Sequence, residues 1–125
     1  MKKLLLVEDN DVNRELMLRR LQRRGYEIQT AVDGNDAVEK TRQFEPDLII
    51  MDISLPVMDG IEASRIIKAD ENFTKIPIVG LSAHALQADR QAALNAGLDD
   101  YVTKPVDFEN LINIIERLLK PAVEP

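Results

Sequence analysis

Short apolar runs of strand length alternate along this chain with longer segments whose apolar residues recur at helical spacing. The runs lie at residues 3–7, 26–32, 47–51, 76–81 and 100–103. The first shows no alternation of apolar and polar positions, which is typical of a strand buried on both faces. The second is more polar and is predicted to lie near the sheet edge, whereas the third is the most apolar and is predicted to lie at the centre.

The segments between these runs predict helices. The apolar stripe of the first helix consists of Val12, Leu16, Met17 and Leu21. The arginines of this segment lie largely outside that stripe and are interpreted as a solvated face; they are Arg14, Arg19, Arg20, Arg23 and Arg24. Further helices are predicted through residues 37–44, from Asp59 onward, near residues 86–95 and at 108–119, where the periodicity is clearest.

Five strands that alternate with five helices predict an α/β domain of three layers, with a parallel sheet and right-handed crossovers. In such sheets the functional residues gather beyond the carboxyl ends of the strands. We expect one domain over residues 1–120, a short tail at 121–125 and no output domain.

The composition is that of an ordinary folded domain. The chain has 125 residues, of which 45% are hydrophobic and 30% are charged, and this is enough chain to bury a core. Its apolar runs are far shorter than the ~20 residues of a membrane helix. The absence of cysteine excludes disulfides, thiolate catalysis and cysteine–zinc sites, and is compatible with the cytoplasm. A net charge of −6 argues against direct nucleic-acid binding.

Polar residues follow four of the five predicted strands. Glu8 and Asp9 follow the first, Asp52 the third, Ser82 the fourth and Lys104 the fifth. Carboxylates that converge at one sheet edge repel each other and raise each other's pKa unless a cation joins them. Because the candidate ligands are oxygen atoms alone, the cation that suits them is a hard ion such as Mg²⁺.

The same residues suit phosphoryl transfer, which needs mainly positioning and charge neutralisation. Asp52 lies deepest and can act as a nucleophile that forms an acyl phosphate. Lys104 can pair with this carboxylate before reaction and with a phosphoryl oxygen after it. Ser82 offers a hydroxyl to another phosphoryl oxygen.

Each of these residues also has an ordinary structural interpretation. Asp9 alone would be interpreted as a helix cap, Asp52 as a turn residue and Lys104 as a solvated loop lysine. Capping does not explain the right residue type at four strand ends together. His84 is interpreted as a surface or gating residue, and for Tyr101 core packing and a half-exposed, mobile ring remain equal alternatives.

With these residues in view, the chain closely resembles the receiver domain of two-component response regulators over essentially its whole length. The likeness covers chemotaxis receivers and those of phosphorelays and hybrid kinases, and it suggests a stand-alone relay or diffusible regulator. It implies a flavodoxin-like fold with strand order 2-1-3-4-5. The motifs that carry the resemblance are Leu6-Val-Glu-Asp-Asn10, Asp47-Leu-Ile-Ile-Met-Asp52, Leu55-Pro-Val-Met-Asp-Gly60, Leu81-Ser-Ala83 and Tyr101-Val-Thr-Lys-Pro105.

The resemblance implies that Asp52 takes a phosphoryl group from a phosphohistidine on a sensor kinase or a phosphotransfer protein. It also implies that Asp9, Asp52 and the backbone carbonyl of Ser54 bind Mg²⁺, for which Mn²⁺ can substitute. Glu8 would act largely through water. Lys104, joined to the next residue by a cis peptide, would contact the phosphate; that residue is Pro105.

The resemblance further implies a switch formed by Ser82 and Tyr101. The hydroxyl would move toward the phosphate and the ring would turn inward. This would reshape the face made by residues 86–95, 100–103 and 108–119, and so control an unidentified downstream protein or relay the phosphoryl group. We expect a monomer, and leave dimerisation on phosphorylation open.

Two other functions remain as alternatives to the switch. One is a Mg²⁺-dependent phosphohydrolase that works through an aspartyl phosphate, although position 54 is serine where such an enzyme needs a second aspartate. The other is an interaction module that works without phosphorylation. Ser54 and His84 border the expected site and are hypothesised to tune the lifetime of the phosphoryl group.

Overall fold

The computed structural model describes residues 1–53, 59–82, 91 and 94–120. Within them the strands and helices alternate as the sequence predicts up to the fourth strand, and five strands form one parallel sheet. The strands are β1 (Lys3–Val7), β2 (Glu27–Ala31), β3 (Leu48–Asp52), β4 (Ile78–Ser82) and β5 (Asp100–Thr103). The helices are α1 (Asp11–Arg23), α2 (Gly34–Phe44), α3 (Gly60–Ala69) and α5 (Phe108–Leu119).

The sheet order is β2-β1-β3-β4-β5, so the predicted three-layer fold and strand order are confirmed. β3 lies at the centre and β2 at an edge, as their composition predicted. The register aligns the strand ends that carry the polar residues. Val7 pairs with Met51, Asp52 with Leu81, and the last residue of β4 pairs with the last of β5.

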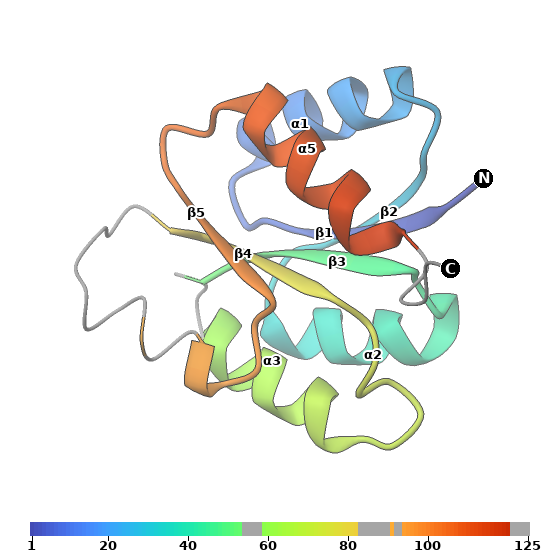
Figure 1. Cartoon of the computed structure of the whole chain (residues 1–125), viewed down its shortest axis with the longest axis vertical. Helices are drawn as coiled ribbons and strands as arrows, with labels where there is room; N and C mark the ends of the chain where they lie inside the picture. The colour runs from blue at the N-terminus through green and yellow to red at the C-terminus, as the bar shows by residue number, and fades with distance from the viewer. Residues whose placement is uncertain (54–58, 83–90, 92–93, 121–125) are drawn as a thin grey trace.

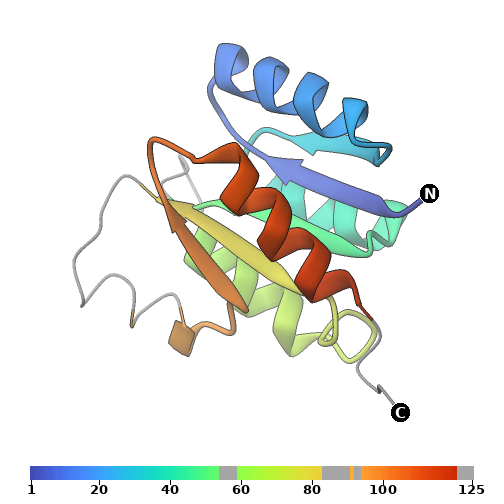
Figure 2. The same ribbon diagram turned by 45° about the horizontal axis from the view of Figure 1, so that its top comes forward.

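The sheet is covered by helices on both faces (Figures 1 and 2). One face packs against α1 and α5, and the other packs against α2 and α3. Alternate residues of each strand point to opposite faces: in β1, Leu4 and Leu6 join the cluster under α1 and α5, and Leu5 and Val7 join the other. All four are fully buried, which explains why this run shows no alternation.

The sheet-facing side of α1 differs from the predicted stripe. Val12 is 75% exposed and Leu16 is 55% exposed, so neither belongs to the core. The positions that face the sheet are instead 14, 17, 18 and 21, which recur at helical spacing and end in the fully buried Leu21. The stripe was misplaced because two apolar residues lie on the solvent side of this helix.

Helix α1 is capped by Asn10, whose side chain accepts a hydrogen bond from the backbone N–H of Asn13 at 2.9 Å. Helix capping therefore does not account for Asp9, the residue before it. Equivalent caps by aspartate begin the other three helices that the structure describes, at Asp33, Asp59 and Asp107.

Several sequence predictions fall outside the described residues. They are the loop at 54–58 with Ser54, the residue His84, most of the helix expected near 86–95, and the tail at 121–125. Among the helices within the described ranges, none combines the length and the apolar character needed to cross a membrane.

Gly60 begins α3 directly behind the end of β3, and there is no room there for a side chain. A Cβ at this position would lie 2.3 Å from the backbone oxygen of Asp52 and 2.7 Å from the Cα of Ile53. We expect Gly60→Ala to lower the free energy of unfolding by about 2 kcal/mol or more, because backbone atoms must shift to admit the methyl group. Urea denaturation measures this.

The control for Gly60→Ala is Arg65→Ala, on the exposed side of the same helix. Arg65 makes a surface ion pair with Glu62 at 3.2 Å, and its loss should cost about 0.5 kcal/mol or less. Equal stability losses in the two variants would contradict the steric argument.

Candidate metal centre

Three carboxylates meet at the carboxyl edge of the sheet. Glu8 and Asp9 follow β1, Asp52 ends β3, and each offers one oxygen such that these atoms all lie within 4.8 Å of one another. Glu8 and Asp52 are buried, with 4% and 2% of their surface exposed, whereas Asp9 is exposed. The sequence prediction that these strand ends converge is therefore correct for the acidic residues.

Strand pairing holds the two buried acids in place. The backbone N–H of Glu8 donates to the carbonyl of Ala31 at 3.0 Å, which extends the pairing of β1 with β2 by one residue. The N–H of Asn10 donates to the Glu8 carboxylate at 3.2 Å. Asp52 pairs with Leu81 of β4. Both side chains are thus carried on backbone that the sheet makes rigid.

Lys104 supplies the positive charge at this edge. Its Nζ lies 3.1 Å from Oδ2 of Asp52 and 3.6 Å from Oε1 of Glu8. The backbone N–H of Lys104 donates to the carbonyl of Ser82 at 2.7 Å, so the β4–β5 pairing continues past β5 and places the ammonium group over the carboxylates. The peptide bond between Lys104 and Pro105 is cis.

Burial raises the pKa of Glu8 to about 7. The N–H of Asn10 opposes this effect by bonding to the carboxylate, the negative charge of Asp52 adds to it, and the charge of Lys104 opposes it. Without a metal, Glu8 therefore keeps its proton to a higher pH than a solvent-exposed glutamate does.

This arrangement fits a divalent cation. Within the described part of the chain, three carboxylates form the cluster, and the ammonium group of Lys104 is ion-paired with the two buried ones. The ligand atoms that the three carboxylates offer are all oxygen. Oxygen donors with an open side suit Mg²⁺, which keeps several of its water ligands in proteins. A bound cation would also favour the charged form of Glu8 and lower its pKa.

Ser82 and Tyr101 are both buried, on the neighbouring strands β4 and β5. Ser82 ends β4 and is 2% exposed, and its neighbour Leu81 pairs with Asp52. Tyr101 lies in β5 and is 7% exposed, within the apolar cluster that packs against α2 and α3. The sequence left two interpretations of Tyr101 open, and the structure agrees with core packing of its ring.

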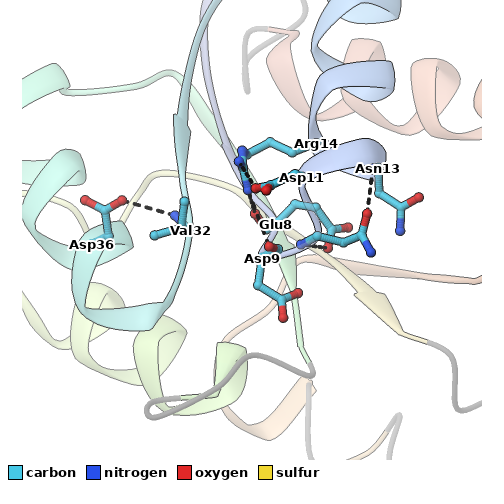
Figure 3. Close-up of polar contacts among 8 residues, drawn as sticks. Glu8, Asp9, Asp11, Asn13, Arg14, Val32 and Asp36 are labelled. Carbon is cyan, nitrogen blue, oxygen red and sulfur yellow. Dashed lines mark hydrogen bonds and ion pairs between the residues drawn. The ribbon is translucent and has the colours of Figure 1, made fainter.

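The sequence interpretation missed Arg14, which was assigned to a solvated face with the other arginines of α1. Its side chain is only 19% exposed, and it donates from Nη1 to the backbone carbonyl of Glu8 at 2.9 Å (Figure 3). The signal that could have found it is its spacing from Met17, Leu18 and Leu21, which places it on the buried side of the helix.

A cavity of about 590 Å³ opens beside the carboxylates, between α1 and residues 104–106. Glu8 and Lys104 are among its polar lining residues, and Leu16 and Met17 of α1 form part of its apolar wall. The cavity therefore reaches one carboxylate of the acidic cluster, that of Glu8.

The fold and the acidic edge together define a flavodoxin-like α/β domain with an acidic cluster, suited to a metal ion, at the carboxyl ends of its strands. The chain belongs to the response regulator receiver domain family, whose family model matches residues 4–116. Receiver domains of this family are signalling switches in two-component and phosphorelay systems. The family match favours a switch over the phosphohydrolase alternative.

Relatives at the sequence level include receivers that stand alone and receivers inside larger kinases. The polar-differentiation response regulator DivK of Brucella ovis is 33% identical over 121 residues, which cover 97% of this chain and 98% of DivK. Hybrid signal transduction histidine kinase I of Dictyostelium discoideum is 37% identical over 130 residues, or 98% of this chain. The match spans only 7% of that kinase, and a match to hybrid kinase G of the same organism spans 3% of it.

Solved structures agree with this assignment. The receiver domain of the sensor histidine kinase PA1611 from Pseudomonas aeruginosa PAO1, with a magnesium ion in its active site cleft, has a TM-score of 0.88 and 42% identity, covering 94% of this chain and 97% of that one. The receiver domain of Ssk1 from Saccharomyces cerevisiae, in complex with the phosphotransfer protein Ypd1, has a TM-score of 0.87 and 32% identity, with coverages of 94% and 88%.

The raised pKa of Glu8 predicts how the stability of the metal-free protein depends on pH. The folded state binds the proton more tightly than the unfolded state, so the stabilising effect of this proton is lost as the pH rises from about 4.5 to about 7. We expect Glu8→Gln to be more stable than the wild type above pH 7, by about 1–3 kcal/mol, and this gain should shrink toward pH 4.5.

Urea denaturation in the presence of a chelator, at several pH values, measures this difference. Glu15→Gln, at an exposed position on α1, is the control and should show no comparable pH dependence. A Glu8→Gln gain that stays constant between pH 4.5 and pH 8 would contradict the assigned pKa.

Proposed function

We propose that Asp52 accepts a phosphoryl group from a phosphohistidine donor. An oxygen of its carboxylate attacks the phosphorus atom, the phosphorus–nitrogen bond of the donor breaks, and its electron pair returns to the imidazole ring. The products are an aspartyl acyl phosphate and a histidine. The observation that carries this proposal is a buried carboxylate at a strand end that faces Lys104 at 3.1 Å and two further acids.

Mg²⁺ is the proposed cofactor, and Asp9 and Asp52 are its proposed direct ligands, together with the backbone carbonyl of Ser54. Glu8 acts largely through water and adjusts the charge of the site. The similarity to the PA1611 receiver, whose structure holds a magnesium ion in the active site cleft, supports this choice. When bound, the cation neutralises charge on the transferring phosphoryl group. Mn²⁺ is proposed as a substitute.

Three residues are proposed to respond to the phosphoryl group. Lys104 passes from its ion pair with Asp52 to a phosphoryl oxygen, and Ser82 donates its hydroxyl to another. Tyr101 lies on the strand next to Ser82, since Gly80 of β4 pairs with it, and its ring couples the site to the face that includes β5 and α5. With these groups the domain assists its own phosphorylation and dephosphorylation.

The proposed donor is a sensor histidine kinase or a histidine phosphotransfer protein. The likeness to the Ssk1 receiver, solved in complex with Ypd1, supports the second class, and the likeness to receivers of hybrid kinases supports the first. We propose that the protein is a cytoplasmic monomer that meets these donors by diffusion. Its output is contact with a downstream protein or onward transfer of the phosphoryl group.

Phosphorylation of Asp52 is tested by incubating the protein with phosphoramidate and Mg²⁺, followed by mass spectrometry. We expect a mass increase of ~80 Da, the mass of one phosphoryl group, that is labile to base. Asp52→Ala should abolish it. Asp70→Asn, at the C-terminal end of α3 away from the acidic cluster, is the control and should be modified like the wild type. An adduct of undiminished yield in Asp52→Ala would refute the proposal.

The variant Lys104→Met distinguishes the role of Lys104 in Mg²⁺ binding from its role in phosphorylation. Loss of the ammonium group removes a positive charge close to the carboxylates, so we expect Mg²⁺ to bind severalfold more tightly. Phosphorylation at saturating Mg²⁺ should nonetheless slow at least tenfold, because one stabilising contact to the phosphoryl oxygens is lost. Titration calorimetry and phosphorylation kinetics measure the two effects. A variant that binds Mg²⁺ more weakly, or reacts at the wild-type rate, would contradict the assigned role.

A further inference from the structure

Arg14 is a charged residue on the side of α1 that faces the sheet. Its side chain is 19% exposed, and a guanidinium group held this deep needs acceptors for its N–H groups. Nη1 donates to the backbone carbonyl of Glu8 at 2.9 Å and makes a longer contact to that of Asp9 at 3.5 Å. Nη2 makes an ion pair with Asp11 (Figure 3).

The two carbonyl groups belong to the residues that carry two of the three carboxylates of the acidic cluster. Because each peptide unit is planar, a hydrogen bond to its carbonyl oxygen restrains the orientation of the whole unit, and so of the backbone from which the side chains extend. In Figure 3 the guanidinium group of Arg14 lies against the backbone of Glu8 and Asp9, and the Asp9 carboxylate points away from it. Arg14 therefore contacts the backbone that carries two of the carboxylates, not the carboxylates themselves.

We infer that Arg14 is a positioning residue that holds the backbone of Glu8 and Asp9 in the arrangement that binds a divalent cation. This inference rests on the proposed role of the acidic cluster as the Mg²⁺ site. Outer groups that orient metal ligands commonly change metal affinity 10- to 100-fold when they are removed. The planar fork of arginine suits the task, because it serves the backbone carbonyl and the Asp11 carboxylate together.

Positioning and simple electrostatics predict opposite effects here. A guanidinium group near the site repels Mg²⁺, so loss of its charge alone would tighten Mg²⁺ binding. Loss of a positioning contact would weaken binding. The sign of the change in affinity therefore distinguishes the two roles. A purely structural role would lower the stability of the fold and leave the affinity of the folded protein unchanged.

The test is calorimetric titration of Mg²⁺ into the wild type and Arg14→Gln. We expect the dissociation constant of Arg14→Gln to be about tenfold higher. Arg19→Gln is the control, because Arg19 lies on the same helix and forms an exposed ion pair with Glu15. It loses the same charge and should bind Mg²⁺ within about twofold of the wild type. Unchanged or tighter binding in Arg14→Gln overturns the inference.

A second measurement reports the backbone directly. In the presence of a chelator, we expect Arg14→Gln to speed hydrogen exchange at the amide of Asn10, which bonds to the Glu8 carboxylate, more than at the amide of Ile49 in β3. Equal acceleration at both amides would indicate a general loss of stability and overturn the inference. Arg14→Lys keeps the positive charge but loses the forked guanidinium group, so we expect it to bind Mg²⁺ severalfold more weakly than the wild type. This variant provides the test if Arg14→Gln fails to fold.

A third variant, Asp9→Asn, distinguishes failure of this inference from failure of the proposed metal site. Asp9→Asn should weaken Mg²⁺ binding strongly if the acidic cluster is the metal site. If the wild type and Asp9→Asn bind Mg²⁺ equally, the metal site itself is wrong. If only Asp9→Asn weakens binding and Arg14→Gln does not, the metal site stands and the role of Arg14 is wrong.

Discussion

The ion pair between Lys104 and the buried carboxylate of Asp52 is the interaction on which the site depends. A buried charge without a partner costs several kcal/mol, so Asp52 at 2% exposure requires a cation nearby. Lys104 provides it across 3.1 Å, from the other side of β4. The same ammonium group also lies near Glu8, and it leaves the cluster with excess negative charge. That excess is what makes the edge of the sheet receptive to a divalent cation.

The parallel sheet allows this charge to be placed so deep. Neighbouring strands end at matched positions, since Val7 pairs with Met51 and Asp52 pairs with Leu81. Side chains that are far apart in the sequence are therefore presented on a common rigid edge, and apolar layers beneath α1 and α5 and above α2 and α3 hold that edge in place. Rigid support of this kind suits phosphoryl transfer, where the protein contributes mainly position and charge.

The fold class and the strand ends could be read from the sequence because they depend on local patterns, whereas the full strand order came from the resemblance to receiver domains. Continuous apolar runs such as residues 47–51 mark buried strands, and the rule that sites lie at the carboxyl ends of parallel strands then brings Glu8, Asp52 and Lys104 together. The buried side of helix α1 was harder to predict, because Val12 and Leu16 are apolar yet exposed to solvent. Periodicity alone cannot separate an exposed stripe from a buried one.

The sequence by itself determined which residues carry charge, which runs become strands and which strand ends meet. Tertiary structure alone decided the rest. In the folded protein Tyr101 is packed in the core, and burial raises the pKa of Glu8. The side chain of Arg14 lies against the backbone that carries the acids. The physical reason is that burial and hydrogen-bond partners depend on the rotation of each helix against the sheet. Contacts with distant segments set that rotation, and residue patterns within the helix record it only in part.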